Sequence, residues 1–170
     1  MSLSYQYLGS QSIVSGLIWN LYGYQIPSDA VWGVPVAFDP TLEDAYQRDT
    51  TLVITMPVTD LVYTGPATLT YSRIDLGTLV PASANVITMP DVPFSTYDIL
   101  TQINTVYALG LTEDDVQDVQ YINDQGPFNL IAKPGSLAWK NTLALTVNLS
   151  DLTPLTLAIP VVAVGSLTAS

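Results

Sequence analysis

The stretch Ser95-Thr-Tyr-Asp-Ile-Leu-Thr-Gln-Ile-Asn-Thr-Val-Tyr-Ala-Leu-Gly110 predicts the main helix of the chain. Ser95 is suited to cap a helix, and Asp98 three residues later completes a capping-box pattern. Apolar residues then recur at helical spacing, at Ile99, Leu100, Ile103, Val106 and Tyr107. Gly110 is expected just past the helix end. The pattern predicts a helix over about 95–109 that packs one apolar stripe on a sheet.

Strand-like segments lie on both sides of this helix. They are short apolar runs that end at prolines, or stretches in which apolar and polar residues alternate. In order they are 52–56, 67–74, 86–89, 128–133 and 142–149. In the last of them Leu143, Leu145, Val147 and Leu149 are expected to face inward. Strands, a helix and further strands predict an α+β, mainly β domain: a sandwich-like or sheet domain with one main packed helix.

A group of acidic residues follows the main helix. Thr112 is a candidate cap for a short second helix over about 113–120, with acids in its first turn where they complement the helix dipole. The same carboxylates are the best candidates for a divalent-cation site, although their spacing is not that of an EF-hand loop. The candidate ligands are Glu113, Asp114, Asp115 and Asp118. A solvated helix start explains them without a metal, and we expect no cofactor.

Residues 1–50 are predicted to form an irregular N-terminal arm or layer, distinct from a β-rich domain over 51–170. Aromatic residues recur beside turn formers, and Ile13–Trp19 is expected to be a short strand. The aromatic side chains at Trp19, Tyr22, Tyr24 and Trp32 are candidate contacts to a neighbouring subunit. If this region is an arm, removing the first 25 or so residues is expected to leave a folded domain.

The composition favours assembly over catalysis. Only 11% of the 170 residues are charged and 48% are hydrophobic, whereas an ordinary domain carries roughly 25% charged residues. Interfaces between permanently associated subunits are depleted in charge in the same way. We therefore expect contacts with further copies of the chain or with other proteins. A single tightly packed domain with a neutral Ser/Thr-rich surface is the alternative.

Several classes of function are disfavoured. The chain has four Lys and Arg against 15 Asp and Glu, a net charge of −11, which argues against nucleic acid as a partner. It has no histidine and no cysteine, which are among the side chains most often used for proton transfer, nucleophilic attack and metal binding. No stretch is long and apolar enough to predict a membrane span, and no signal-peptide pattern is present. We therefore expect no enzyme activity.

Two alternatives from other classes stay open. Adjacent acids at Glu43 and Asp44 are the candidate pair for a small hydrolase. Tryptophans that stack on sugar rings would instead indicate a carbohydrate-binding adhesion module. The candidates for that role are Trp19, Trp32 and Trp139.

Two stretches resemble structural proteins of tailed-phage virions that have no characterised activity. The first is 91–116, with Asp-Ile-Leu-Thr-Gln-Ile-Asn followed by Leu-Thr-Glu-Asp-Asp, and the second is 132–140, Ala-Lys-Pro-Gly-Ser-Leu-Ala-Trp-Lys. The resemblance covers about a third of the chain and includes no catalytic or ligand residue. It implies a virion location, with a capsid-decoration or other head-associated role first and a tail or neck role second. Its implied partners are further copies of the chain and other virion proteins.

The apolar segment at 155–164 is the second candidate contact region. Its apolar residues are interrupted by Pro160, which together with its length argues against a membrane span. Its candidate interface residues are Leu157, Ile159, Val161 and Val162.

Overall fold

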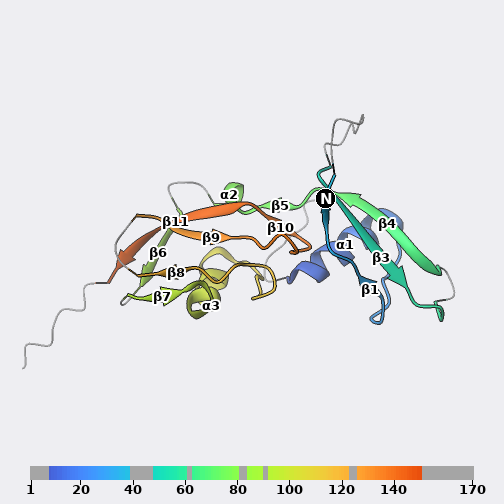
Figure 1. Cartoon of the computed structure of the whole chain (residues 1–170), viewed down its shortest axis with the longest axis horizontal. Helices are drawn as coiled ribbons and strands as arrows, with labels where there is room; N and C mark the ends of the chain where they lie inside the picture. Colours follow the sequence, from blue (N-terminus) through green and yellow to red (C-terminus); the bar gives the residue numbers. More distant parts are fainter. Residues whose placement is uncertain are drawn as a thin grey trace, which may run out of the picture.

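The structure, a computed structural model, describes residues 8–38, 48–60, 63–80, 84–89, 92–122 and 126–150. Two groups of strands lie side by side along the long axis of the molecule, each with its own hydrophobic core (Figure 1). The predicted α+β, mainly β fold class is confirmed.

The first sheet is antiparallel and is built around β3 (Thr50–Met56). β4 (Gly65–Tyr71) pairs with one edge of β3 along seven residue pairs. β1 (Val31–Trp32) and β2 (Val36–Ala37) pair with β3 over its two halves. Since β4 occupies one edge of β3 throughout, β1 and β2 lie along the other edge.

Helix α1 (Ser10–Tyr22) covers one face of this sheet, so the strand expected at 13–19 is wrong. Its side chains at i and i+4, Val14 and Ile18, pack on the inward face of β3 and β4. The first core consists of Val14, Ile18, Ala30, Leu52, Ile54, Met56, Leu69 and Tyr71.

The ends of α1 explain why its sequence does not indicate a helix. At the start, Gly9 occupies the cap position and provides no side-chain hydrogen bond. At the end, Gly23 adopts φ 66° and its N–H donates to the Trp19 carbonyl at 2.8 Å. With β-branched residues inside and no polar cap, burial on the sheet stabilises this helix more than its intrinsic propensity does.

The second sheet has the order β6–β11–β9. The central strand β11 (Thr142–Leu149) runs parallel to β6 (Val86–Met89) and antiparallel to β9 (Phe128–Ile131). All three occur where strands are predicted. The inward orientation expected for Leu149 is wrong, because β9 pairs only with the first four residues of β11 and the far end of the strand is exposed.

Helix α3 (Thr96–Tyr107) confirms the predicted main helix and its capping box. The Ser95 hydroxyl accepts from the Asp98 N–H at 3.4 Å, and the Asp98 carboxylate accepts from the Ser95 N–H at 2.8 Å. Gly110 is not the residue that ends the helix, because Ala108 takes the left-handed conformation at φ 54°. A Cβ on Gly110 would lie 2.4 Å from the Leu8 carbonyl oxygen, so glycine allows the N-terminal segment to approach.

Short elements complete the second half. β5 (Ile74–Asp75) pairs in parallel with β10 (Trp139–Lys140), and β7 (Phe94–Ser95) pairs antiparallel with β8 (Gln120–Tyr121). The four-residue helix α2 (Leu76–Leu79) begins where the Asp75 carboxylate accepts from the Gly77 N–H at 2.8 Å.

The short helix expected over about 113–120 does not form. Glu113–Asp115 form a turn instead, closed by the Asp115 N–H donating to the Thr112 carbonyl at 3.0 Å. Val116 then bridges to Ala132, and β8 begins at Gln120. The pairing with the distant 132 segment outweighs the local helix signal.

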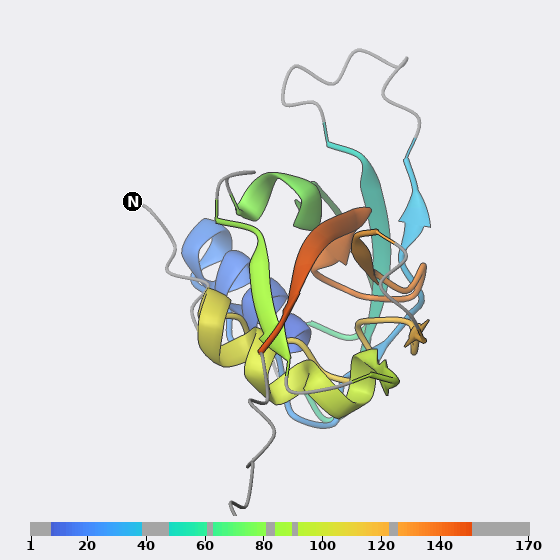
Figure 2. The same cartoon turned by 90° about the vertical axis from the view of Figure 1, so that its left-hand side faces the viewer.

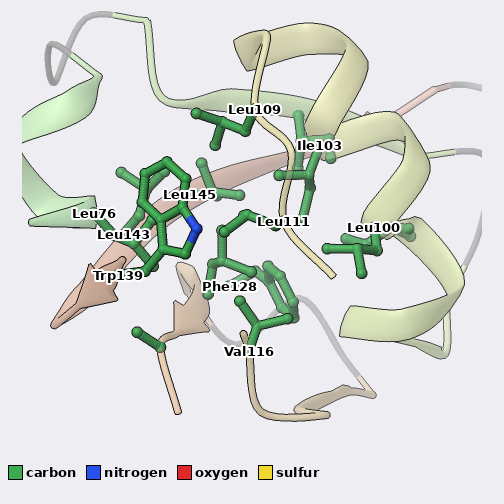
Figure 3. Packing of buried hydrophobic residues seen from close by; sticks show 14 of the residues in the cluster. Leu76, Leu100, Ile103, Leu109, Leu111, Val116, Phe128, Trp139, Leu143 and Leu145 are labelled. Atoms are coloured by element: carbon green, nitrogen blue, oxygen red, sulfur yellow. The ribbon is translucent and has the colours of Figure 1, made fainter. Parts of the chain in front are cut away.

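The second core lies between α3 and the second sheet (Figure 3). Trp139 is fully buried among leucine side chains, and its indole Nε1 has no hydrogen-bond partner. The labelled residues of this core are Leu76, Leu100, Ile103, Leu109, Leu111, Val116, Phe128, Trp139, Leu143 and Leu145.

Helix α1 joins the two cores. Ile13 belongs to the second core, whereas Val14 and Ile18 belong to the first. Adjacent residues of a helix point about 100° apart, so α1 presents a different face to each half. The predicted division of the chain into 1–50 and 51–170 stays a prediction. The first of these two parts contains α1, β1 and β2.

Candidate interaction surface

The outward face of α1 carries large apolar side chains. Trp19 is 55% exposed and Tyr22 70%. Since the opposite side of the helix already packs on both cores, these residues contribute nothing to the packing of the sheet. Exposed apolar patches of this kind mark sites of interaction with other proteins.

A groove lies between the C-terminal end of α1 and the strands β3 and β4. Its volume is about 350 Å³, which is near the lower end of the range for ligand-sized pockets. It is lined by aliphatic and aromatic side chains, namely Ile18, Tyr22, Tyr24, Ile54, Met56, Tyr63, Ala67, Thr68 and Leu69. We call it the tyrosine groove.

Hydrogen bonds hold the rings of the tyrosine groove in place. The Tyr24 hydroxyl donates to the Asp60 carboxylate, and this bond raises the pKa of Tyr24 to about 12. Asp60 also accepts from the Tyr63 N–H at 2.8 Å. The Tyr24 and Tyr63 rings meet edge to face with centroids 4.7 Å apart. The Tyr24 and Tyr63 rings are therefore held against each other in the groove, and the Tyr24 hydroxyl already has a hydrogen-bond acceptor.

The face of the first sheet that points away from α1 is a second apolar surface. Its strands bury alternate residues toward the helix and leave the others outside. The exposed valines on this face are Val31, Val36 and Val53. We call this the valine face. Among the described helices, α1 packs on the opposite side of the sheet.

A buried polar cluster links the start of α1 to the second half. Asp115 is 2% exposed and accepts from the hydroxyls of Ser10 and Ser136, the latter at 2.7 Å. Its second oxygen accepts from the Thr112 N–H and hydroxyl at 3.0 and 2.9 Å. The carboxylate thus joins three segments of the chain.

The cations of the chain are committed to internal contacts. Arg73 donates to the Thr50 hydroxyl and to the carbonyls of Pro134 and Ser136. Lys140 pairs with Asp49. Lys133 donates to the Glu113 carbonyl and to the hydroxyl of Tyr97, and Arg48 also has an interaction partner.

The four candidate metal ligands do not converge. Asp115 is buried in the polar cluster, Glu113 and Asp114 are exposed, and Asp118 accepts from the Tyr97 N–H at 3.2 Å. Across residues 8–150, leaving out the gaps in the described ranges, no group of three or more acidic side chains could hold a metal ion. Their placement gives the divalent-cation hypothesis no support.

The predicted aromatic contacts divide into two groups. Trp19 and Tyr22 are exposed, whereas Trp32 is half-buried in the first core and Tyr24 lines the groove. The C-terminal candidates Leu157, Ile159, Val161 and Val162 lie outside the described residues, as does the acidic pair Glu43 and Asp44.

The sequence analysis missed the valine face, and it missed Tyr63, Met56 and Ala67 in the groove. The valines and Met56 belong to strands whose alternation is readable in the sequence, but alternation does not tell which face stays uncovered. That depends on where α1 packs. None of the helices placed by the structure is long and apolar enough to cross a membrane.

Comparison with known proteins identifies one family. Residues 25–169 match a family of unknown function, DUF7941, and the chain belongs to it. No curated protein and no solved structure matches the chain significantly.

Proposed function

We propose that this member of the DUF7941 family is a non-enzymatic structural protein of a tailed-phage particle, held there by contacts between subunits. The observation that carries the proposal is the exposure of apolar side chains on both sides of the first sheet, on α1 and on the opposite face. Trp19, Tyr22 and the valine face expose large side chains although the chain already has two filled cores. Burying this surface against protein would remove it from water at a gain of roughly 25 cal/mol per Å².

The phage assignment derives from the resemblance of residues 91–116 and 132–140. In the fold these two stretches form one packed unit. The Lys133 N–H donates to the Asp115 carbonyl at 2.8 Å, and the Lys133 ammonium contacts Tyr97 and Glu113. A resemblance spread over one structural unit is better support than two unconnected short matches.

The charge distribution supports a place away from the packaged genome. The net charge is −11, and the three cations Arg73, Lys133 and Lys140 are tied to internal acceptors. DNA phosphates would therefore be repelled. Our first choice is the exterior of the head, as a decoration protein, and the second is a tail or neck component.

Trans-complementation of a phage that lacks its own copy of the gene tests the proposal. The wild-type chain is expected in purified particles in constant ratio to the major capsid protein, as measured by quantitative mass spectrometry. Val31→Glu places a charge on the valine face at a side chain that is 66% exposed. It should reduce incorporation at least about tenfold, a loss of about 1.4 kcal/mol of contact energy.

Val106→Glu is the matched control, because Val106 is 53% exposed on α3 and belongs to neither apolar surface. It should incorporate like the wild type. Absence of the wild-type chain from purified particles would refute the proposal. Immunogold labelling of heads or of tails would decide between its two locations.

The carbohydrate alternative rests on Trp19, because Trp139 is buried and Trp32 is half-buried. Trp19 borders a shallow hollow with Gly16 and Ile26. A saturable change in tryptophan fluorescence on titration with bacterial polysaccharides, lost in Trp19→Ala, would favour it over the structural role.

A further inference from the structure

The tyrosine groove opens beside a strand edge. Among the described strands β4 pairs only with β3, so the other edge of its seven residues has no strand partner there. Three successive β4 residues, Ala67, Thr68 and Leu69, line the groove. An extended segment added to this edge would gain main-chain hydrogen bonds, and alternate side chains would enter the groove.

The segment 155–164 has the composition that such a site requires. In an extended chain Leu155, Leu157 and Ile159 share one face. The only charged residue after Ser150 is Asp151, so the segment brings no charge into a groove lined by apolar and tyrosine side chains. Pro160 limits the strand to its first half, and proline rings pack well on aromatic faces.

The segment 155–164 follows β11, whose end lies far from the tyrosine groove of the same chain (Figure 1). β11 ends at Leu149, at the opposite end of the long axis from β3 and β4 (Figure 1). In the view along this axis, β11 lies in front and β3 lies behind it (Figure 2). The five residues from Ser150 to Leu155 span at most about 18 Å when fully extended. A compact chain of this length has a radius of gyration of about 15 Å and hence a diameter of about 40 Å. A groove on a second copy is within reach, whereas its own groove is not.

We infer that residues 155–159 of one copy add as a strand to the β4 edge of a second copy and place Leu155, Leu157 and Ile159 in its tyrosine groove. This contact joins different surfaces of the two partners. It closes as a dimer where the exchange of segments is reciprocal, and it continues head-to-tail into rings or filaments where it is not. The inference rests on the proposed function and specifies the partner, a second copy of the chain.

Three full-length variants test this arrangement. Tyr22→Glu blocks the groove at a side chain that is 70% exposed, and Ala67→Glu blocks it independently from β4. The double substitution Leu157→Asp with Ile159→Asp disables the segment. The wild type is expected to form dimers and larger species at about 100 µM by light scattering. Each variant alone should be monomeric, with unchanged circular dichroism.

The decisive sample is an equimolar mixture of a groove variant with the segment variant. One intact groove and one intact segment then remain, so the mixture should form a dimer and nothing larger. An isologous contact between two grooves predicts a different result, because the segment variant alone would then assemble like the wild type. Val106→Glu on α3 is the control and should assemble like the wild type.

A mixture that stays monomeric, or a segment variant that assembles like the wild type, would overturn the inference. The proposed function would survive either result if the chain were still incorporated into particles through the valine face. Loss of incorporation by Val31→Glu with normal self-assembly would leave the contact between groove and segment in place. The two proposals therefore fail in distinguishable ways.

Discussion

Asp115 shows how far the role of a single residue can depend on distant partners. Its sequence neighbours indicate an exposed acidic helix start, yet its carboxylate is buried between Ser10 and Ser136, which lie 105 and 21 positions away. An isolated buried carboxylate is costly, and here four hydrogen bonds offset that cost. Asp115 therefore holds α1 against the second half of the molecule.

Replacing Asp115 by Ala should lower the free energy of unfolding by about 1–3 kcal/mol, because the Ser10 and Ser136 hydroxyls lose their acceptor. The adjacent exposed Asp114→Ala is the control and should change it by less than about 0.5 kcal/mol. Urea denaturation followed by circular dichroism measures both. Equal effects would mean that the polar cluster does not stabilise the fold.

Tyr71 predicts a loss of stability at alkaline pH. Its hydroxyl donates to the Leu137 carbonyl at 2.6 Å, and burial, with an opposing effect of Arg73, raises its pKa to about 12. The folded state thus holds this proton more tightly than the unfolded state, whose tyrosine pKa is about 10. The stability contribution is complete below pH 10 and is lost as pH rises toward 12.

Urea midpoints measured from pH 8 to pH 12 test this sign. Tyr71→Phe should cost about 1 kcal/mol at pH 8 and should lose less stability than the wild type between pH 10 and 12. Tyr22→Phe, at an exposed position, is the control and should follow the wild type. If the urea midpoints of the wild type and of Tyr71→Phe fell in parallel with pH, Tyr71 would not be the cause of the loss of stability in alkali.

At the scale of single elements, the repeated sequence Val-Ile-Thr-Met-Pro shows what local pattern decides. It occurs at 53–57 and 86–90, and in both copies Ile and Met are buried while Val and Thr are exposed. The pairing differs, because β3 is antiparallel to β4 whereas β6 is parallel to β11. Alternation thus selects the buried face, and long-range contacts select the partner strand.

The α3 capping box gives a prediction for an element that the sequence identifies correctly. Ser95→Ala removes the side-chain acceptor of the Asp98 N–H and should cost about 1 kcal/mol. Thr101→Ala, at an exposed position of the same helix, should cost less than about 0.5 kcal/mol. Thermal unfolding monitored by circular dichroism separates the two, and equal shifts would contradict the capping role.

Helix α1 gives the opposite case, an element that the sequence does not reveal. Ile18→Ala should cost about 2–4 kcal/mol, because it leaves a cavity in the first core. Leu21 lies three residues later on the same side of the helix, but at its C-terminal end, where it is 61% exposed, so Leu21→Ala should cost less. Chemical denaturation of the two variants tests where the first core ends along the helix, and a larger loss for Leu21→Ala would contradict this packing.

At the scale of the whole molecule, the two cores are held together by α1 and by charged contacts. Removing the first 25 or so residues would therefore take Ile13, Val14 and Ile18 out of two cores. The expectation that a folded domain remains after this truncation does not fit such packing. Single substitutions on the outward face of α1 are the better test of its contacts.

The Asp49–Lys140 ion pair connects the first half to β10 and predicts acid sensitivity. Partial burial raises the pKa of Asp49, but hydrogen bonds from Lys140, Thr50 and the Arg73 backbone outweigh it, and the pKa is lowered from 3.8. The contribution of this carboxylate is present above pH 3.8 and is lost as pH falls through the folded-state value. At pH 7 the urea midpoint of the wild type should be higher than that of Asp49→Asn, and the difference between the two midpoints should disappear in acid. A difference that grew in acid would contradict the lowered pKa of Asp49.

The sequence by itself determined the mainly β class, five strand regions, the α3 helix with its cap, and a surface poor in charge. These features follow from local periodicity and side-chain chemistry, which act within a few residues. Only the tertiary structure decided that residues 10–22 are a helix, that 113–120 is a turn and strand, and which apolar residues remain exposed. Those outcomes depend on burial against residues distant in the chain, and burial contributes more free energy than local propensity.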